Sequence, residues 1–383
     1  MALSVLVAGD FCQTGRLFSL IKNREYDSML SSVKPIIKSA DYSIVNFEFP
    51  IVSKEKIAKP IPKCGPNLKG TIESVEAIKF AGFNCCTLAN NHIMDQGAEC
   101  AFETKKFLNN SSIDTVGFGN NSEEAGKVLY KEINGESLVI INCCEHEFSI
   151  ATVSKPGANA LNPIKQYYAI SEAKAKANYV IVIVHGGHEL FHLPSLRMQD
   201  TYRFFIDAGA DAVVNHHQHC YSGYEVYKDK PIFYGLGNFL FDKYGNRTSV
   251  SKLWNEGFMV KLSFTQSKVD YSITPYIQCL TGPYIELLND TDSRLFFQQL
   301  KRLNSIIEDR DQLTNLVNAY YDSSKKIEYR TFEPYRNRVL LKLYSMGLLP
   351  RFIKGSKRLS ILNRIACESH RDKVIHVFEH KGL

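Results

Sequence analysis

The sequence predicts a layered α/β protein with mixed β-sheets, followed by a helical C-terminal region. Short β-rich runs alternate with helical patterns over the first 280 residues, as layered α/β folds require. The later runs show more alternation and hairpin character, which favours a mixed sheet system over an all-parallel one. After Asn289 apolar residues recur at three- and four-residue spacing, as they do in amphipathic helices.

Ten short runs are predicted to be strands, and four longer segments between them show helical periodicity. The predicted strands are Ser4–Ala8, Ser43–Phe47, Asn84–Leu88, Ile113–Val116, Ser137–Asn142, Tyr179–Val184, Ala212–Asn215, Ile232–Tyr234, Gly257–Phe264 and Asp270–Ile277. The predicted helices are Thr71–Ala81, Ala98–Asn109, Pro163–Asn178 and Ser195–Ala208. The stretch Ser53–Leu68 holds several lysines and prolines and is predicted to be a loop.

The C-terminal region is predicted to contain helices at Asp292–Asn315 and Tyr335–Met346. A chain of 383 residues is too long for one average core, so a large domain with an appendage is expected. We therefore place a boundary near residue 285. It divides the chain into a main domain, residues 1–285, and a helical basic region, residues 286–383.

The net charge of +6 is unevenly distributed along the chain. Residues 325–383 contain 14 Lys or Arg against 5 Asp or Glu, which leaves +9 there and −3 in the remainder. The basic character therefore says little about the substrate of the main domain. Basic residues lie among leucines and isoleucines in Leu340–Ile365, a pattern that could lie on an anionic membrane. We favour the alternative of a helix packed on the main domain with its charges solvated.

The ten cysteines and the N-terminal sequence indicate the cellular compartment. The adjacent pairs Cys85-Cys86 and Cys143-Cys144 fall in strand-like runs, where cysteine usually serves as a small buried apolar group, so a reducing compartment fits best. No apolar run approaches the ~20 residues that cross a bilayer. The first run, Leu3–Ala8, follows no basic leader, so we expect no signal peptide and a cytoplasmic location, with membrane association left open.

Metal-ligand side chains gather where predicted strands end. Eight of the eleven histidines lie between positions 92 and 219, and most follow an apolar strand directly. Loops at the carboxyl ends of strands in open α/β folds project into one crevice. Five strand ends carry such residues: Gly9-Asp10, Asn46-Phe47-Glu48, Asn90-Asn91-His92-Ile93-Met94-Asp95, His185-Gly186-Gly187-His188-Glu189 and Asn215-His216-His217-Gln218-His219.

This set of side chains suits divalent transition metals. Imidazole binds Zn, Mn or Fe, and a carboxylate can bridge two ions, whereas an all-oxygen set would suggest Mg or Ca. Two ions ~3.5–4 Å apart could activate a water and stabilise the leaving oxygen of a phosphoester. The sequence therefore predicts one or two divalent ions, with Mn, Fe or Zn favoured.

Each strand end also has a simpler structural explanation. A glycine-aspartate pair after a strand is commonly a turn with a capping carboxylate, and a lone buried histidine is more often a hydrogen-bonded core residue than a ligand. His217 and His219 form a more specific signal, because alternate residues of an extended segment face the same side. The occurrence of five such strand ends in one chain favours the metal site over the simpler explanations.

These motifs together resemble a known family. Gly9-Asp10, Asn46-x-Glu48-x-Pro50, Ala89-Asn90-Asn91-His92-x-x-Asp95-x-Gly97, His185-x-Gly187-x-Glu189, His216-His217-x-His219 and Tyr234-Gly235-Leu236-Gly237-Asn238-Phe239 are similar to the successive motifs of the CapA-type family. That family is named for poly-γ-glutamate capsule synthesis and belongs to the calcineurin-like metallophosphoesterase superfamily. The resemblance covers about residues 4–245 and implies a four-layer α/β/β/α sandwich, here with a C-terminal helical extension.

The resemblance also implies roles for individual residues. Asp10 and His219 resemble ligands of a first metal, Glu48 the bridging carboxylate, and Asn91, His185 and His217 ligands of a second metal. His92 resembles the histidine that contacts the substrate phosphate or protonates the leaving oxygen, and Asp95 is placed to orient it. No superfamily role transfers to His188, Glu189, His192 or His216, for which second-shell or substrate contacts and plain structural roles are both open. Asn238 is expected to shape the floor of the site.

The sequence departs from the superfamily at two of these positions. Phe11 and Cys12 follow Asp10 where the superfamily has any residue and then histidine, and Glu48 replaces the usual aspartate. The resemblance therefore implies that the first metal has fewer protein ligands than is usual.

Two functions from different classes follow. The first is a metal-dependent hydrolase, with phosphoesters the favoured substrates, associated with capsule, poly-γ-glutamate or other exopolymer synthesis. The second is a non-catalytic metal-bearing accessory protein that binds the polymer or its precursor. Nucleic-acid processing ranks last, because the basic tail lacks interleaved aromatic residues and no nucleic-acid-binding module is visible. The expected partner is a small-molecule or polymer substrate and no nucleic acid, with the capsule machinery and a peripheral membrane contact through the basic tail left open.

Overall fold

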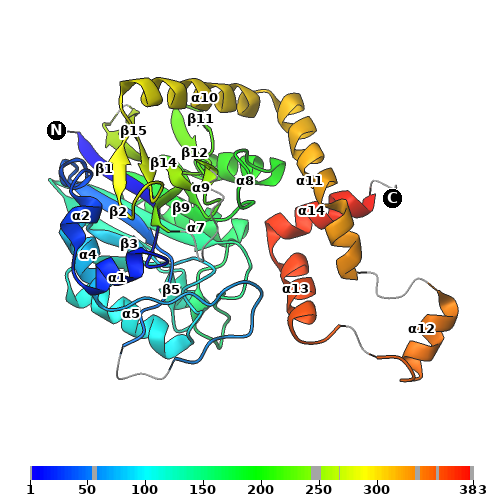
Figure 1. Ribbon diagram of the computed structural model, residues 1–383. Helices are drawn as coiled ribbons and strands as arrows, with labels where there is room; N and C mark the ends of the chain where they lie inside the picture. Colours follow the sequence, from blue (N-terminus) through cyan, green and yellow to red (C-terminus); the bar gives the residue numbers. More distant parts are fainter. Residues whose placement is uncertain are drawn as a thin grey trace.

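The fold is a sandwich of two β-sheets with helices on both outer faces (Figure 1). It is seen in a computed structural model that describes residues 2–53, 58–242, 252–266, 268–332, 337–350 and 353–379. Within this part of the chain no helix is both long enough and apolar enough to span a membrane.

The first sheet is built around the N-terminal strand. Its strands, in spatial order, are β16 (Ile285–Leu287), β15 (Val269–Gln278), β14 (Glu256–Phe264), β1 (Leu3–Cys12), β2 (Tyr42–Phe47), β3 (Cys85–Thr87) and β4 (Asp114–Val116), with β13 (Asn238–Phe241) beside the end of β1. Strands β1 to β4 are parallel, and β14 to β16 are antiparallel. The mixed sheet is therefore confirmed.

The second sheet has a parallel centre and antiparallel edges. Its order is β11 (Tyr224–Tyr227), β12 (Lys230–Phe233), β10 (Ala212–His216), β9 (Tyr179–His185), β7 (Glu136–Cys144) and β6 (Leu129–Ile133). A short pair, β5 (Phe118–Gly119) and β8 (Gly157–Ala158), lies apart from both sheets.

Two cores hold the layers together. Alternate residues of β1 serve different cores: Val5 and Val7 pack toward the second sheet, whereas Leu6 and Ala8 pack toward helices. The helices on the first sheet's outer side are α1 (Leu17–Lys22), α2 (Tyr26–Leu30), α3 (Lys34–Lys38), α4 (Glu73–Ala81) and α5 (Ala98–Asn110). On the second sheet lie α7 (Pro163–Lys174) and α8 (Leu196–Asp207). These are the four layers that the resemblance implied.

The remaining helices are short connections or belong to the C-terminal region. The connections are α6 (Ser122–Ala125) and α9 (Lys252–Asn255). The C-terminal helices are α10 (Asp290–Glu308), α11 (Arg310–Phe332), α12 (Arg338–Ser345), α13 (Gly355–Ala366) and α14 (Glu368–Glu379). Leu300, Leu303 and Ile307 of α10 join the core of the second sheet, so the region is attached through apolar packing.

Several predicted boundaries were wrong. Strand β1 does not end at Ala8 but continues to Cys12, so Asp10 lies within it. The single helix predicted over Asp292–Asn315 is divided at Asp309, where the backbone is extended and the carboxylate accepts the amide hydrogen of Gln312 at 3.0 Å to cap α11. Residues 335 and 336 of the predicted helix Tyr335–Met346 lie outside the described residues.

Candidate metal centre

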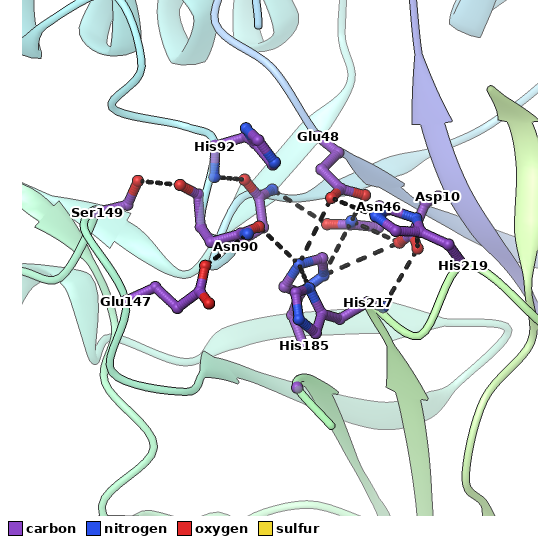
Figure 2. Close-up of polar contacts among 12 residues, drawn as sticks. Asp10, Asn46, Glu48, Asn90, His92, Glu147, Ser149, His185, His217 and His219 are labelled. Atoms are coloured by element: carbon purple, nitrogen blue, oxygen red, sulfur yellow. Dashed lines mark hydrogen bonds and ion pairs between the residues drawn. The ribbon is translucent and has the colours of Figure 1, made fainter. Parts of the chain in front are cut away.

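Residues from both sheets meet at one edge of the sandwich (Figure 2). Asp10 and Glu48 come from β1 and the residue after β2, and His185 ends β9. Asn91 follows β3, and His217 and His219 follow β10. The six side chains predicted to hold metal, separated by up to two hundred positions in sequence, are thus brought together.

One donor set surrounds the Nε2 atom of His185. This nitrogen lies 3.0 Å from Asn91 Oδ1, 3.1 Å from the Nδ1 of His217 and 3.7 Å from Glu48 Oε1. Four donors placed tetrahedrally at ~2.0–2.1 Å from one ion are about 3.4 Å apart. The spacing of these atoms therefore fits a divalent ion at their centre.

A second donor set shares Glu48. The ligand atoms of Asp10, Glu48 and His219 lie within 4.8 Å of one another, with 3.8 Å between His219 Nε2 and Glu48 Oε1. The Nδ1 of His219 lies 2.9 Å from Asn238 Oδ1, and an N–H donated there leaves the lone pair on Nε2 facing Glu48. Asn238 therefore orients a candidate ligand.

Glu48 is the best evidence that these residues suit a cation. Its side chain is fully buried, and its Oε1 atom has no hydrogen-bond partner among the residues that the structure describes. Burial, followed by the charges of Asp10 and Glu189, raises the pKa of Glu48 well above its ordinary value. An unpartnered buried carboxylate oxygen is costly unless it is protonated or coordinates a cation. A divalent ion in either donor set would supply the missing partner of this oxygen.

The backbone after β10 is held in an unusual conformation. His217 and His219 have φ values of 90° and 54°, in the left-handed region that non-glycine residues seldom adopt. Such conformations persist only where surrounding structure enforces them, and they cluster at functional sites. The backbone amide of His217 donates to Asp10 Oδ2 at 3.2 Å, which ties this segment to β1.

Two asparagines that were not predicted as site residues hold the framework in place. Asn46 donates to Asp10 Oδ1 at 2.7 Å and lies 3.3 Å from His185 Nδ1. Asn90 donates to Asn46 Oδ1 and to the carbonyl of Phe47. Both lie in the quoted motifs, so their position beside ligands was the signal that could have identified them.

His92 is held by a buried charge pair. Its Nδ1 lies 2.6 Å from Asp95 Oδ2, and Asp95 Oδ1 accepts from Lys63 Nζ at 2.6 Å. Burial, followed by the charge of Lys63, lowers the pKa of His92. The predicted pairing of His92 with Asp95 is present. Lys63, whose side chain is only 3% exposed, lies in the predicted loop and carried no sequence signal.

Besides His92, Asp95 and Asn238, three further predicted site residues lie outside the two donor sets. His188 is paired with the C-terminal region, since its Nε2 lies 3.0 Å from the hydroxyl of Tyr321. His216 contacts the carbonyl of Ala8 through Nε2 at 3.0 Å, which joins β10 to β1. Glu189 is an exposed residue. Desolvation of its carboxyl acts to raise the pKa, but the charges of the neighbouring imidazoles, His219 first, outweigh this effect and lower the pKa below its usual value.

One further acidic residue belongs to the centre. Asn91 donates through Nδ2 to Glu147 Oε2 at 2.7 Å, so the amide oxygen is turned toward His185. Glu147 follows β7, the one predicted strand beside β9 whose carboxyl end was not considered. Its place after a strand was the signal that was missed.

Two proteins of Bacillus that are named for capsule or PGA biosynthesis are similar to about two thirds of this chain. The capsule biosynthesis protein CapA of Bacillus anthracis is 34% identical over 259 residues, which are 66% of this chain and 62% of that protein. The PGA biosynthesis protein CapA of Bacillus subtilis is 32% identical over 254 residues, 66% of each chain. The chain thus spans slightly less than two thirds of the length of these relatives.

More distant similarities extend to other bacteria. A "probable polyglutamine synthesis accessory protein" of Mycobacterium tuberculosis is 26% identical over 220 residues, 54% of this chain and 57% of that protein. The crystal structure of a 5′-nucleotidase precursor from Thermus thermophilus covers 79% of this chain and 59% of its own at 13% identity, with a TM-score of 0.43 that is too low to carry an argument. Residues 4–243, more than half of the sequence, match the family described as bacterial capsule synthesis protein PGA_cap, and the chain belongs to that family.

Proposed function

We propose that this protein is a metal-dependent hydrolase of phosphoester bonds that acts in capsule or exopolymer synthesis. The observation that carries the proposal is the shared carboxylate: Glu48 belongs to both donor sets, and its Oε1 is buried without a hydrogen-bond partner. A carboxylate shared by two sets of nitrogen and oxygen donors can hold two ions close together, as two-metal hydrolysis needs.

Each donor set has a defined membership in this proposal. Asp10, Glu48 and His219 would hold one ion, and Asn91, His185 and His217 would share Glu48 in holding the other. Burial, followed by the charges of the neighbouring imidazoles, lowers the pKa of His185 well below its usual value, so its ring is neutral and free to coordinate. Mn, Fe or Zn suits the imidazole-rich donors, and such ions supply an activated water and neutralise phosphate charge.

His92 is proposed to contact the substrate. An Nδ1–H bond to Asp95 fixes the ring and leaves Nε2 to interact with the phosphate or the leaving oxygen. Lys63 donates to the other carboxylate oxygen of Asp95, and the backbone amide of Leu68 donates to Asp95 Oδ2 at 2.6 Å. Asp95 therefore cannot rotate away without losing two further hydrogen bonds.

The capsule assignment is supported by the names of the relatives. Two CapA proteins of Bacillus are named for capsule or PGA biosynthesis. We therefore propose a phosphorylated precursor of a capsule polymer as the class of substrate. Poly-γ-glutamate has amide bonds and no phosphoester bond, so this centre would bind it without cleaving it. The accessory name of the Mycobacterium tuberculosis relative supports the second candidate, in which the same centre binds the polymer without cleaving it.

The test is hydrolysis of phosphomonoester and phosphodiester model substrates by metal-free protein supplied with Mn, Fe or Zn. We expect His92→Ala to lower kcat about 10²–10⁴-fold, the usual contribution of a positioned acid or base, with unchanged metal content. The matched control is His192→Asn: His192 Nδ1 lies 2.5 Å from the carbonyl of Tyr221, and the asparagine amide can replace that donor. Activity that His92→Ala leaves intact would contradict the proposal. No turnover with any metal, together with retained binding of poly-γ-glutamate, would favour the accessory function.

The C-terminal region is proposed to contact an anionic membrane surface. Large apolar side chains are exposed along it, including Leu348 at 64%, Leu362 at 53% and Ile365 at 55%. Basic side chains that are exposed or half-exposed accompany them: Arg338, Lys342, Lys354, Lys357, Arg358 and Arg364. Exposed apolar residues within a basic segment suit the boundary between lipid headgroups and acyl chains.

A further inference from the structure

The loop after β7 is hydrogen-bonded to the first residues of α14. The backbone amide of His146 donates to Glu368 Oε2 at 2.9 Å, and the imidazole Nδ1 lies 2.5 Å from Glu368 Oε1. Glu145 accepts from the hydroxyl of Ser369 at 2.8 Å and from its backbone amide at 3.3 Å. Consecutive residues of this loop are thus fixed by the start of α14, more than two hundred positions away.

Glu147, the next residue, connects this loop to the metal centre. Its Oε2 accepts from Asn91, as described above, and its Oε1 accepts from Asn363 of α13 at 3.5 Å. The same amide nitrogen of Asn363 donates to His370 Nδ1 of α14 at 2.9 Å. A continuous chain of contacts therefore runs from His370 through Asn363, Glu147 and Asn91 to the Nε2 of His185.

A partly buried ion network, centred on the buried carboxylate of Glu145, holds α14 against the sandwich. Arg197 of α8 donates to Glu145 Oε1 at 2.6 Å and to Asp372 Oδ2 of α14 at 2.9 Å. Figure 1 shows α13 and α14 beside the sandwich, with α12 farther out. The family match ends at residue 243, so the helices that make these contacts lie outside it.

We infer that α13 and α14 are a functional part of the metal centre: Asn363 and His370 are positioning residues that hold Glu147 and, through it, the ligand Asn91. The inference rests on the proposed metal centre and deepens it. An amide oxygen is a weak ligand that must be pointed at the ion, and outer partners of ligands commonly change metal affinity 10–100-fold. Docking of the C-terminal helices would then control how tightly the ion at His185 and His217 is held.

The first experiment measures metal affinity rather than activity. Mn²⁺ or Zn²⁺ is titrated calorimetrically into the metal-free, full-length protein and its variants. We expect Glu147→Ala to weaken one of the sites about 10–100-fold and Asn363→Ala to weaken the same site about three- to tenfold. His370→Ala should behave like Asn363→Ala, and His370→Asn, whose side-chain oxygen can still accept from Asn363, should restore affinity. Glu379→Ala, at the exposed end of α14, is the control that should bind like the wild type.

The second experiment uses the reciprocity of linked equilibria. If docked helices strengthen metal binding, bound metal must strengthen docking by the same factor. We expect Mn²⁺ to slow hydrogen exchange of the α14 amides in the full-length protein, and to do so less in Asn363→Ala, with α7 as the internal control. Metal binding that leaves α14 exchange unchanged would overturn the inference.

The two experiments separate this inference from the proposed function. A wild-type protein that binds no divalent ion would contradict the metal centre itself. A wild-type protein that binds ions, with Asn363→Ala, His370→Ala and Glu147→Ala all equal to it in affinity, would overturn only the role of the C-terminal helices.

Discussion

At the scale of single residues, Gly9 explains how two backbones can meet beside the metal centre. A Cβ atom at this position would lie 1.8 Å from the carbonyl oxygen of Gly237. The close approach allows Asp10 to pair with Asn238 in the register of β1 and β13. Asp10 is a candidate ligand, and Asn238 orients a second candidate ligand, His219. Gly9 therefore allows these two parts of the metal centre to lie close together.

Gly9→Ala should therefore destabilise the protein and disturb the centre. The added methyl group cannot be accommodated by side-chain motion, because backbone atoms of Gly237 and Phe239 are in its way. We expect a loss of about 2–3 kcal/mol or more in the free energy of unfolding, measured by urea denaturation. The control is Gly126→Ala, where the nearest atom, the carbonyl oxygen of Ser122, would be 3.2 Å away. Equal stabilities of the two variants would show that the approach of β13 is adjustable.

The metal-binding side chains were more predictable from sequence than the residues that hold them. Each candidate ligand follows or ends a β-rich run, and the topology of parallel strands brings such positions together. Lys63 could not be predicted, because its pairing with Asp95 depends on the path of a long loop. His188 was grouped with the site by its place after β9, but it pairs with Tyr321 of α11, a contact that only tertiary packing decides.

At the scale of elements, buried strands were predicted well and short helices poorly. Runs such as Tyr179–Val184 are apolar at every position, which identifies a central strand. Helices α1 to α3 are five or six residues long, too short for a periodic pattern to stand out. Strand β1 exceeds its predicted length because its last residues, Asp10 to Cys12, pair with β13, with a register shift between Asp10 and Phe11.

Arg197 is predicted to be the residue on which the attachment of α14 depends most. Burial opposes ionisation of Glu145, but the charge of Arg197, with the hydrogen bonds of Ser369 and Arg197, lowers the pKa of this carboxyl to about 2. The folded pKa is below the unfolded one, so the stabilisation is present above the unfolded value and lost as pH falls toward about 2. Arg197→Met leaves Glu145 buried without its cation, which should cost about 3 kcal/mol or more.

Two measurements check this prediction. The free energy of unfolding should fall, and the midpoint of acid-induced release of α14, followed by hydrogen exchange, should move to higher pH. Glu145→Gln in the Arg197→Met background is the matched control, since it removes the uncompensated charge and should recover part of the loss. An Arg197→Met protein as stable as the double variant would mean that the buried carboxylate finds another partner.

At the scale of the whole molecule, the C-terminal region has one side in contact with the sandwich and another side exposed to solvent. On one side its helices contact the loop that supports Asn91, and on the other they expose apolar and basic side chains. Only one of these roles could be predicted from the sequence. The concentration of basic residues was visible, but the contacts of Asn363 and His370 with the metal centre depend on how α13 and α14 pack against the sandwich. The division near residue 285 remains a prediction.

The exposed face of this region leads to the last prediction, binding to anionic vesicles. Full-length protein should sediment with phosphatidylcholine vesicles that contain phosphatidylglycerol and much less with phosphatidylcholine alone. Each basic residue near an anionic surface contributes about 1 kcal/mol, so Lys357→Glu with Arg358→Glu should weaken binding at least tenfold, and added salt should do the same. Leu362→Ser with Ile365→Ser should weaken it without changing the charge. The control is Ile164→Ser, which alters an apolar residue on α7 that is exposed to an even greater extent, at 71%. Equal binding to vesicles with and without phosphatidylglycerol would exclude a membrane contact of this kind. So would a dimer in solution in which the exposed leucines of two chains pack together.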